Sequence, residues 1–161
     1  MIRSLSCFFL ILSTGCSGAD PIGNLVDGGS TLSGAADWNV LFQAPTGNAT
    51  SDDIHGLWGG TATLAGTKLD FRFRIDVNRT QVATRCKYND GTELMAGVAA
   101  ATRLESSALT FLESKNSEVK KNALTCSVNV APRTLKFELS GTNLTFEPFT
   151  VDEIRLVKLS D

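Results

Sequence analysis

The chain has 161 residues, 42% of them hydrophobic, and its 15 basic and 17 acidic side chains give a formal net charge of -2 at pH 7. This near balance excludes the strongly basic surface typical of nucleic-acid binding, so we expect no nucleic-acid partner. Without a leader, the length suits one domain.

Residues 1–15 have the pattern of a secretory signal peptide. Arg3 precedes an apolar run at 7–12, and small residues follow it up to Cys16. This order of positive, apolar and small residues is typical of a removable export signal. The run is too short to cross a bilayer, which takes about 20 apolar residues. We therefore expect an exported chain.

Residues 12–16, Leu-Ser-Thr-Gly-Cys, resemble the lipobox of bacterial lipoproteins. The resemblance implies that Cys16 becomes an acylated N-terminus, carrying palmitate or related chains that anchor the protein to a membrane. Ser17 stands where an inner-membrane retention signal has aspartate, which implies the outer membrane of the bacterial cell envelope. The alternative is ordinary signal cleavage nearby, with Cys16 incidental.

Residues 16–53 are expected to form a flexible acidic tether. They are rich in Gly, Ser, Asp and Asn, and no Lys or Arg occurs between Cys16 and Ile54. Such a composition gives a flexible coil. The apolar run 38–42, Trp-Asn-Val-Leu-Phe, interrupts it. We expect this run to dock on the domain as an extra edge segment, the alternative being a contact for a partner.

Residues 54–161 are expected to form one all-β domain. The clearest strand is 68–77, where Leu69, Phe71, Phe73, Ile75 and Val77 alternate with polar residues, because period-two alternation places one face in a core. The full set of expected strands is 57–64, 68–77, 81–88, 93–103, 108–113, 123–130, 134–139, 143–146 and 151–159. The polar stretch 114–121 is interpreted as a connection. Eight or nine short strands predict a small antiparallel up-and-down β-barrel, or alternatively a β-sandwich.

Cys86 and Cys126 are expected to form a disulfide. Of the four cysteines, Cys7 leaves with the signal peptide and Cys16 is the expected anchor. The remaining pair lies in an oxidising compartment, where disulfides persist. Both residues fall on the apolar phase of their strands, so the bridge would join two strands from the core side.

Gly56-Leu57-Trp58 resembles the Gly-x-Trp signature of lipocalins and other calycins. The resemblance implies a lipocalin-like barrel in which Trp58 packs across the base. It also implies that a cation near the end of the last strand, Arg155 or Lys158, packs over the indole ring. The alternative is a generic β-sandwich whose Trp58 fills the core.

The sequence predicts no catalytic residue, metal site or cofactor, so we do not expect an enzyme. His55 is the only histidine, and it follows Asp52 and Asp53. One histidine with two flexible carboxylates does not make a zinc site, and a nucleophilic triad needs a base held by a third group. We expect His55 to be solvated.

A basic face is expected on two adjacent strands, comprising Lys68, Arg72, Arg74, Arg79, Arg85 and Lys87. It could be simply solvated or could meet anionic headgroups or an acidic partner.

The expected function is non-catalytic binding by a monomeric envelope lipoprotein. Its ligand would be a small apolar or amphipathic molecule held in the lipocalin-like barrel. The alternative is a surface or periplasmic protein-interaction module, either adhesin-like or an inhibitor of a hydrolase.

Overall fold

Ten β-strands and one short 3-10 helix make up the part of the chain that the computed structural model describes, residues 38–44, 49, 53–64, 66–147 and 155–161. The elements are η1 (Asn39–Phe42), β1 (Gly56–Leu64), β2 (Thr67–Ile75), β3 (Arg79–Lys87), β4 (Glu93–Glu105), β5 (Ala108–Phe111), β6 (Lys115–Lys121), β7 (Leu124–Val130), β8 (Arg133–Ser140), β9 (Asn143–Glu147) and β10 (Arg155–Ser160).

Eight of these strands close into an antiparallel barrel, in the order β1-β10-β9-β8-β5-β4-β3-β2. The predicted small all-β barrel is therefore confirmed. Chain neighbours pair throughout the barrel, except that β5 pairs with β8 and that the first strand β1 pairs with the last strand β10 to close the barrel. The β6–β7 hairpin forms a separate two-stranded sheet. The barrel is thus an up-and-down meander with one hairpin inserted.

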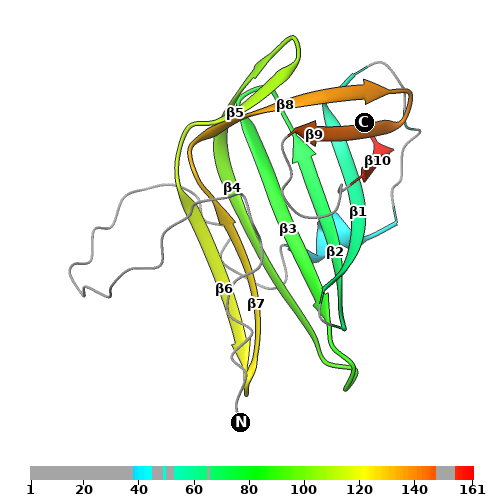
Figure 1. Cartoon of the computed structure of the whole chain (residues 1–161), viewed down its shortest axis with the longest axis vertical. Helices are drawn as coiled ribbons and strands as arrows, with labels where there is room; N and C mark the ends of the chain where they lie inside the picture. The colour runs from blue at the N-terminus through cyan, green and yellow to red at the C-terminus, as the bar shows by residue number, and fades with distance from the viewer. Residues whose placement is uncertain (1–37, 45–48, 50–52, 65, 148–154) are drawn as a thin grey trace, which may run out of the picture.

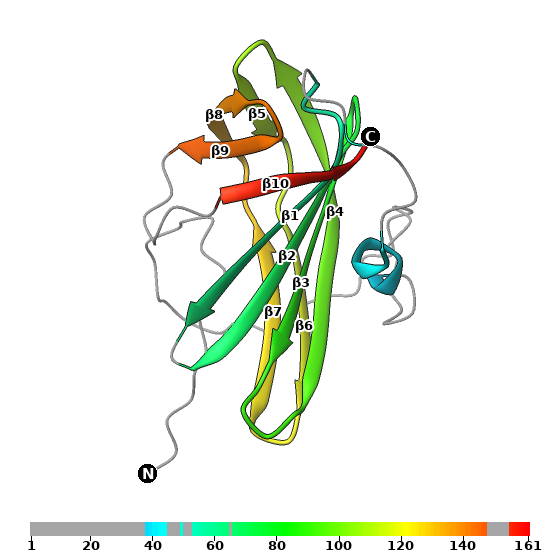
Figure 2. The ribbon, with the colours of Figure 1, turned by 90° about the vertical axis from the view of Figure 1, so that its right-hand side faces the viewer.

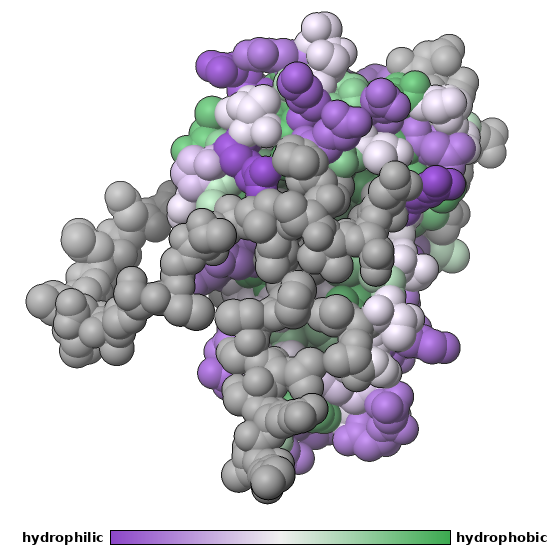
Figure 3. All heavy atoms as spheres, viewed as in Figure 1, coloured by the Kyte–Doolittle hydropathy of each residue, from purple (hydrophilic) through white to green (hydrophobic). Residues whose placement is uncertain are grey.

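The long strands β1 to β4 lie side by side and extend beyond the closed part of the barrel (Figures 1 and 2). At one end of this sheet, β5, β8, β9 and β10 complete the barrel wall. At the other end, the β6–β7 hairpin packs against β3 and β4. Hydrophilic side chains gather at the upper end of the view in Figure 3, over β5 and β8.

Alternation along β2 produces the core face that the sequence predicts. Leu69, Phe71, Phe73 and Ile75 are buried, whereas the residues between them face outward. Val77 was expected to continue this face, and that expectation is wrong. The strand ends at Ile75, the Asp76 amide donates to the Arg79 carbonyl in a turn, and the Val77 side chain is 67% exposed.

The polar segment interpreted as a connection is instead strand β6, paired with β7 along its whole length. Its side chains alternate between exposed and half-buried, but the inward positions include Lys115 and Ser117, so no apolar alternation marks the strand. Its partner β7 supplies the core residues Cys126, Val128 and Val130. The pairing of β6 therefore comes from its neighbour rather than from its own hydrophobicity.

The predicted disulfide is present and joins Cys86 of β3 to Cys126 of β7, with 5.8 Å between their Cα atoms. Both sulfur atoms lie in the core. Nearby, the Tyr88 hydroxyl donates to the Thr125 carbonyl. These contacts hold the inserted hairpin against the inner face of the barrel sheet.

The apolar run 38–42 docks on the outer wall of the barrel, but as one helical turn rather than as an edge strand. Trp38 and Leu41 are buried against Leu57 and Ala83, and Figure 2 shows the helix outside the strands, beside β4. Gly97 makes the fit possible, because a Cβ atom there would lie 2.4 Å from the Trp38 ring. The packed part of the chain thus extends N-terminal of the predicted boundary at Ile54.

Candidate functional site

Large aromatic side chains occupy the interior of the described part of the barrel. Trp58, Phe71, Phe73, Phe111 and Phe146 are only 0–2% exposed. Phe73 packs against Phe146 with ring centroids 6.0 Å apart. These rings are therefore packed in the described core. Eight-stranded barrels are narrow enough to be filled in this way.

Trp58 has the cationic partner that the calycin resemblance implies, and the partner is Lys158. The Lys158 ammonium lies 5.6 Å from the centroid of the indole ring. It also donates to the Asp53 carbonyl at 2.8 Å and forms an ion pair with Asp161 at 2.6 Å. The indole nitrogen donates to the Ile54 carbonyl.

Arg155 does not occupy the position over Trp58. Residues alternate along β10, so that Leu156, Lys158 and Ser160 are buried while Arg155 and Val157 are exposed. Of the two candidates named from the sequence, Arg155 therefore lies on the outward phase and Lys158 on the inward one.

His55 forms a local contact with Asp53 at the start of β1. Its Nδ1 atom lies 2.6 Å from Asp53 Oδ1, and its backbone amide donates to the same oxygen. The backbone hydrogen bond from His55 is the main cause that lowers the pKa of Asp53. Asp52 lies outside the described residues. Within the described ranges, no three His, Cys, Asp or Glu residues cluster as a metal site would require.

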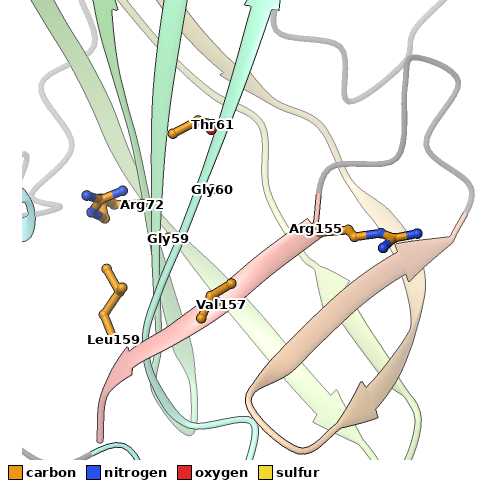
Figure 4. A pocket seen from close by; sticks show the side chains of 7 residues that line it. All are labelled: Gly59, Gly60, Thr61, Arg72, Arg155, Val157 and Leu159. Carbon is orange, nitrogen blue, oxygen red and sulfur yellow. The ribbon is translucent and has the colours of Figure 1, made fainter.

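An open groove lies on the outer wall, where β10 diverges from β1 (Figure 4). Its volume is about 490 Å³. β1 contributes Gly59, Gly60 and Thr61, β2 contributes Arg72, and β10 contributes Arg155, Val157 and Leu159. Figure 4 shows β10 crossing β1 near Gly59 and separating from it toward Arg155.

The glycine pair in β1 creates the floor of this groove. A Cβ atom at Gly59 would lie 2.7 Å from Leu159 Cδ1 and 2.8 Å from Arg72 Nη1. The absence of a side chain therefore lets Leu159 and Arg72 approach the strand from opposite sides. Glycine inside a strand often marks a place where another group approaches closely. Gly59-Gly60 is the one sequence signal that could have indicated the groove, which the sequence analysis did not predict.

Arg72 is held in place beside the groove by contacts with its neighbours. Its Nη1 atom donates to the Phe71 carbonyl at 2.7 Å, and its guanidinium lies 5.0 Å from the centroid of the Phe42 ring. In the described part of the chain, its buried Nε atom has no hydrogen-bond partner. Burial is the main cause that lowers the pKa of Arg72, but a guanidinium remains charged at physiological pH.

The predicted basic face is partly covered by η1. The Phe42 ring lies between Arg72 and Arg85, whose guanidinium is 4.7 Å from the ring centroid. Arg85 also donates twice to Asp70, and Lys87 lies 3.2 Å from the same carboxylate oxygen. Part of this face is therefore neutralised by Asp70 and occupied by an aromatic ring.

The predicted signal peptide, the lipobox and Cys16 lie outside the described residues, and their roles stay predictions. Over the described stretches, no helix has the length and apolar character needed to cross a membrane. No family model, curated protein or solved structure matches this chain. The function must therefore be argued from the site itself.

Proposed function

We propose that this protein is a non-catalytic, lipid-anchored binding protein of the bacterial envelope, which contacts a protein partner through the outer wall of its barrel. The observation that carries the proposal is the groove of about 490 Å³ between β1 and β10. It offers an open surface, two arginines and apolar side chains, whereas the interior is occupied by side chains that are almost completely buried.

We place the binding site on the outer wall rather than inside the barrel because of how the side chains pack in the interior. A lipocalin-like carrier needs an internal cavity, and binding pockets for small molecules commonly enclose about 300–1,000 Å³. Five large inward-facing aromatic side chains, each 0–2% exposed, occupy the described interior instead. The interaction module expected as the alternative from the sequence is for this reason our preferred function.

The character of the groove suits a protein surface. Val157 is 44% exposed, and Leu159 adds further apolar area beside it. Arg72 and Arg155 add positive charge at the same place. Arginine is enriched at protein interfaces, and the buried centre of an interface is more apolar than the remaining surface.

Site-specific photo-crosslinking in the bacterium that encodes the chain tests the proposal. A benzophenone amino acid in place of Val157 is expected to give one discrete crosslinked protein. The same probe in place of Leu112, which is 52% exposed at the end of β5, serves as the matched control. Equal products from both positions, or a tightly bound small molecule in native mass spectrometry of the purified protein, would contradict a wall-binding function.

The lipid anchor is tested separately from the groove. Radioactive palmitate is expected to label the wild-type chain and not the Cys16→Ala variant, because the sulfur atom carries the acyl chains. The variant should also move from the membrane fraction to the soluble fraction. Equal labelling of both chains would remove the anchor from the proposal and leave the groove unaffected.

A further inference from the structure

Strand β1 has one edge that is only partly paired. On one side it pairs with β2 along its whole length, from Gly56 opposite Ile75 to Leu64 opposite Thr67. On the other side it pairs with β10 only at Leu57, Trp58 and Gly59. Within the described chain, the segment 60–64 therefore has no strand on its second side.

Among the described residues, none forms a backbone hydrogen bond with the second side of this edge. In an antiparallel sheet, successive residues direct their backbone groups alternately to the two neighbouring strands. About half of the backbone groups of 60–64 therefore point away from β2, toward the groove. Thr61 and Thr63 are exposed, so the edge is reachable from solvent.

The edge lacks the features by which proteins block unwanted pairing. Open strands are commonly protected by lysine, proline or a bulge. The contrasting case is β6, which pairs only with β7 and carries Lys115, Lys120 and Lys121. The segment 60–64 is Gly-Thr-Ala-Thr-Leu, with no charge and no proline. Within the described chain, the β1 edge thus lacks the lysine residues that protect the β6 edge against pairing with another strand.

We propose that the groove is a strand-addition site, in which an extended peptide segment of the partner protein pairs with the edge 60–64 of β1. This inference rests on the proposed wall-binding function and specifies its partner. Main-chain hydrogen bonds supply the affinity in this mode, and side-chain contacts supply the specificity. The open groove beside Gly60 and Thr61, past the last residue paired with β10, leaves room for the incoming backbone.

The charges beside the edge specify an acidic side chain on the added strand. Arg72 and Arg155 are the charged residues that line the groove, and both are cationic. Each presents a guanidinium to the groove, and a carboxylate is the best planar match for a guanidinium. The partner segment is therefore extended, with one aspartate or glutamate among small or β-branched residues.

The test uses the purified full chain and a seven-residue peptide of alternating threonine and valine with one central glutamate. Amide hydrogen exchange is measured residue by residue. The glutamate peptide is expected to slow exchange within 60–63 by at least about ten-fold, because new hydrogen bonds protect those amides. The amides of β6 should not change. A lysine peptide should bind at least about ten-fold more weakly.

Two N-methylated forms of the peptide, blocked at odd or at even positions, separate strand addition from other contacts. One form should lose binding and the other retain it, since only one set of amides faces β1. Retention by both forms would overturn the proposal. So would protection of 60–63 in the free protein, whether from internal pairing or from self-association through the same edge.

A charge exchange tests the role of the arginines without disturbing the core. Arg155→Glu should weaken the glutamate peptide and strengthen the lysine peptide, whereas Lys136→Glu on the exposed face of β8 should change neither. Unchanged preference in Arg155→Glu would overturn the acidic specificity. If Val157 still crosslinks to a partner while the peptide gives no protection, strand addition fails and the proposed wall-binding function survives.

Discussion

Lys158 is a buried cation whose bonds connect the last strand to the chain before β1. Its side chain is 0% exposed. The ammonium donates to the Asp53 carbonyl, forms an ion pair with the Asp161 carboxylate and lies over the Trp58 ring. Lys158→Met keeps the side-chain length but removes the donor. We expect it to lower the free energy of unfolding by about 1–3 kcal/mol, because the Asp53 carbonyl and the Asp161 carboxylate each lose the contact with the Lys158 ammonium.

The control for Lys158 is Val157→Thr, on the exposed face of the same strand. Urea denaturation should show a change within about 0.5 kcal/mol for this surface substitution. Equal losses in the two variants would mean that the cation over Trp58 adds nothing beyond the general cost of changing β10.

Asp70 links stability to pH through its contacts with Arg85 and Lys87. Burial raises the pKa of the Asp70 carboxyl, but hydrogen bonds from the two cations outweigh it and hold the pKa below the ordinary value of 3.8. A carboxyl with a lowered folded-state pKa stabilises the protein well above pH 3.8, and this stabilisation is lost as the pH falls through the folded-state value. Asp70→Asn should therefore be less stable near neutral pH, with a shallower loss on acidification.

The pH prediction is checked by urea denaturation between about pH 7 and about pH 2, the range over which a perturbed carboxyl titrates. Asp76→Asn, in the exposed turn after β2, is the matched control. Its stability profile should follow that of the wild type. If Asp70→Asn also follows the wild type, the ion pairs at Asp70 contribute nothing to folding.

The docking of η1 on the outer wall depends on one small residue of β4, Gly97. Gly97→Ala would put a methyl group 2.4 Å from a Trp38 ring atom, so the ring must move. We expect a loss of about 1–3 kcal/mol in the free energy of unfolding, as for other overpacked sites. In a Trp38→Ala background the same change should cost less than about 0.5 kcal/mol, because the clash is gone. Additive losses would show that Gly97 acts through its own strand instead.

The β6–β7 hairpin depends on the disulfide for its attachment. Cys86 and Cys126 close a loop with a sequence separation of 40 residues. The chain-entropy model assigns such a loop about 4 kcal/mol of stabilisation. The double variant Cys86→Ala/Cys126→Ala should lose about that amount in urea denaturation. Hydrogen exchange should then show lower protection in β6 and β7 than in β9, and uniform loss of protection would contradict a local role.

The molecule as a whole is a barrel closed over one part of its length, with a helical turn fastened to its outside. A chain that starts at Ile54, the predicted domain boundary, would lack Trp38 and Leu41, which are buried on the outer wall. Burial of one large apolar side chain contributes about 1.5–3 kcal/mol, so this chain should lose at least about 3 kcal/mol. It should also bind a hydrophobic dye, because Leu57 and Met95 become uncovered.

A chain that starts a few residues before Trp38 is the control for this truncation. It should match the full chain in urea denaturation and bind no more dye. Equal stability of the two truncated chains would mean that η1 is not part of the folded unit in solution.

Strand positions could be predicted because alternation is a local property of the backbone. Successive side chains of a strand point to opposite faces, so the pattern around Phe71 and Phe73 was enough to place β2. The same reasoning placed Cys86 and Cys126 on the core side. It failed at β6, whose inward face includes Lys115 and Ser117, because that strand is stabilised by its partner and not by its own apolar residues.

The sequence by itself thus determined the all-β class and the cysteine pair, since each depends on short-range periodicity or on residue type, whereas it left a barrel and a sandwich as alternatives. The tertiary structure decided which cation covers Trp58, because alternation along β10 turns Lys158 inward and Arg155 outward. It also decided where the groove lies. That site exists because β10 leaves β1 after Gly59, and the pairing joins strands from the two ends of the domain. Such a meeting depends on closure of the whole barrel, which no local pattern encodes.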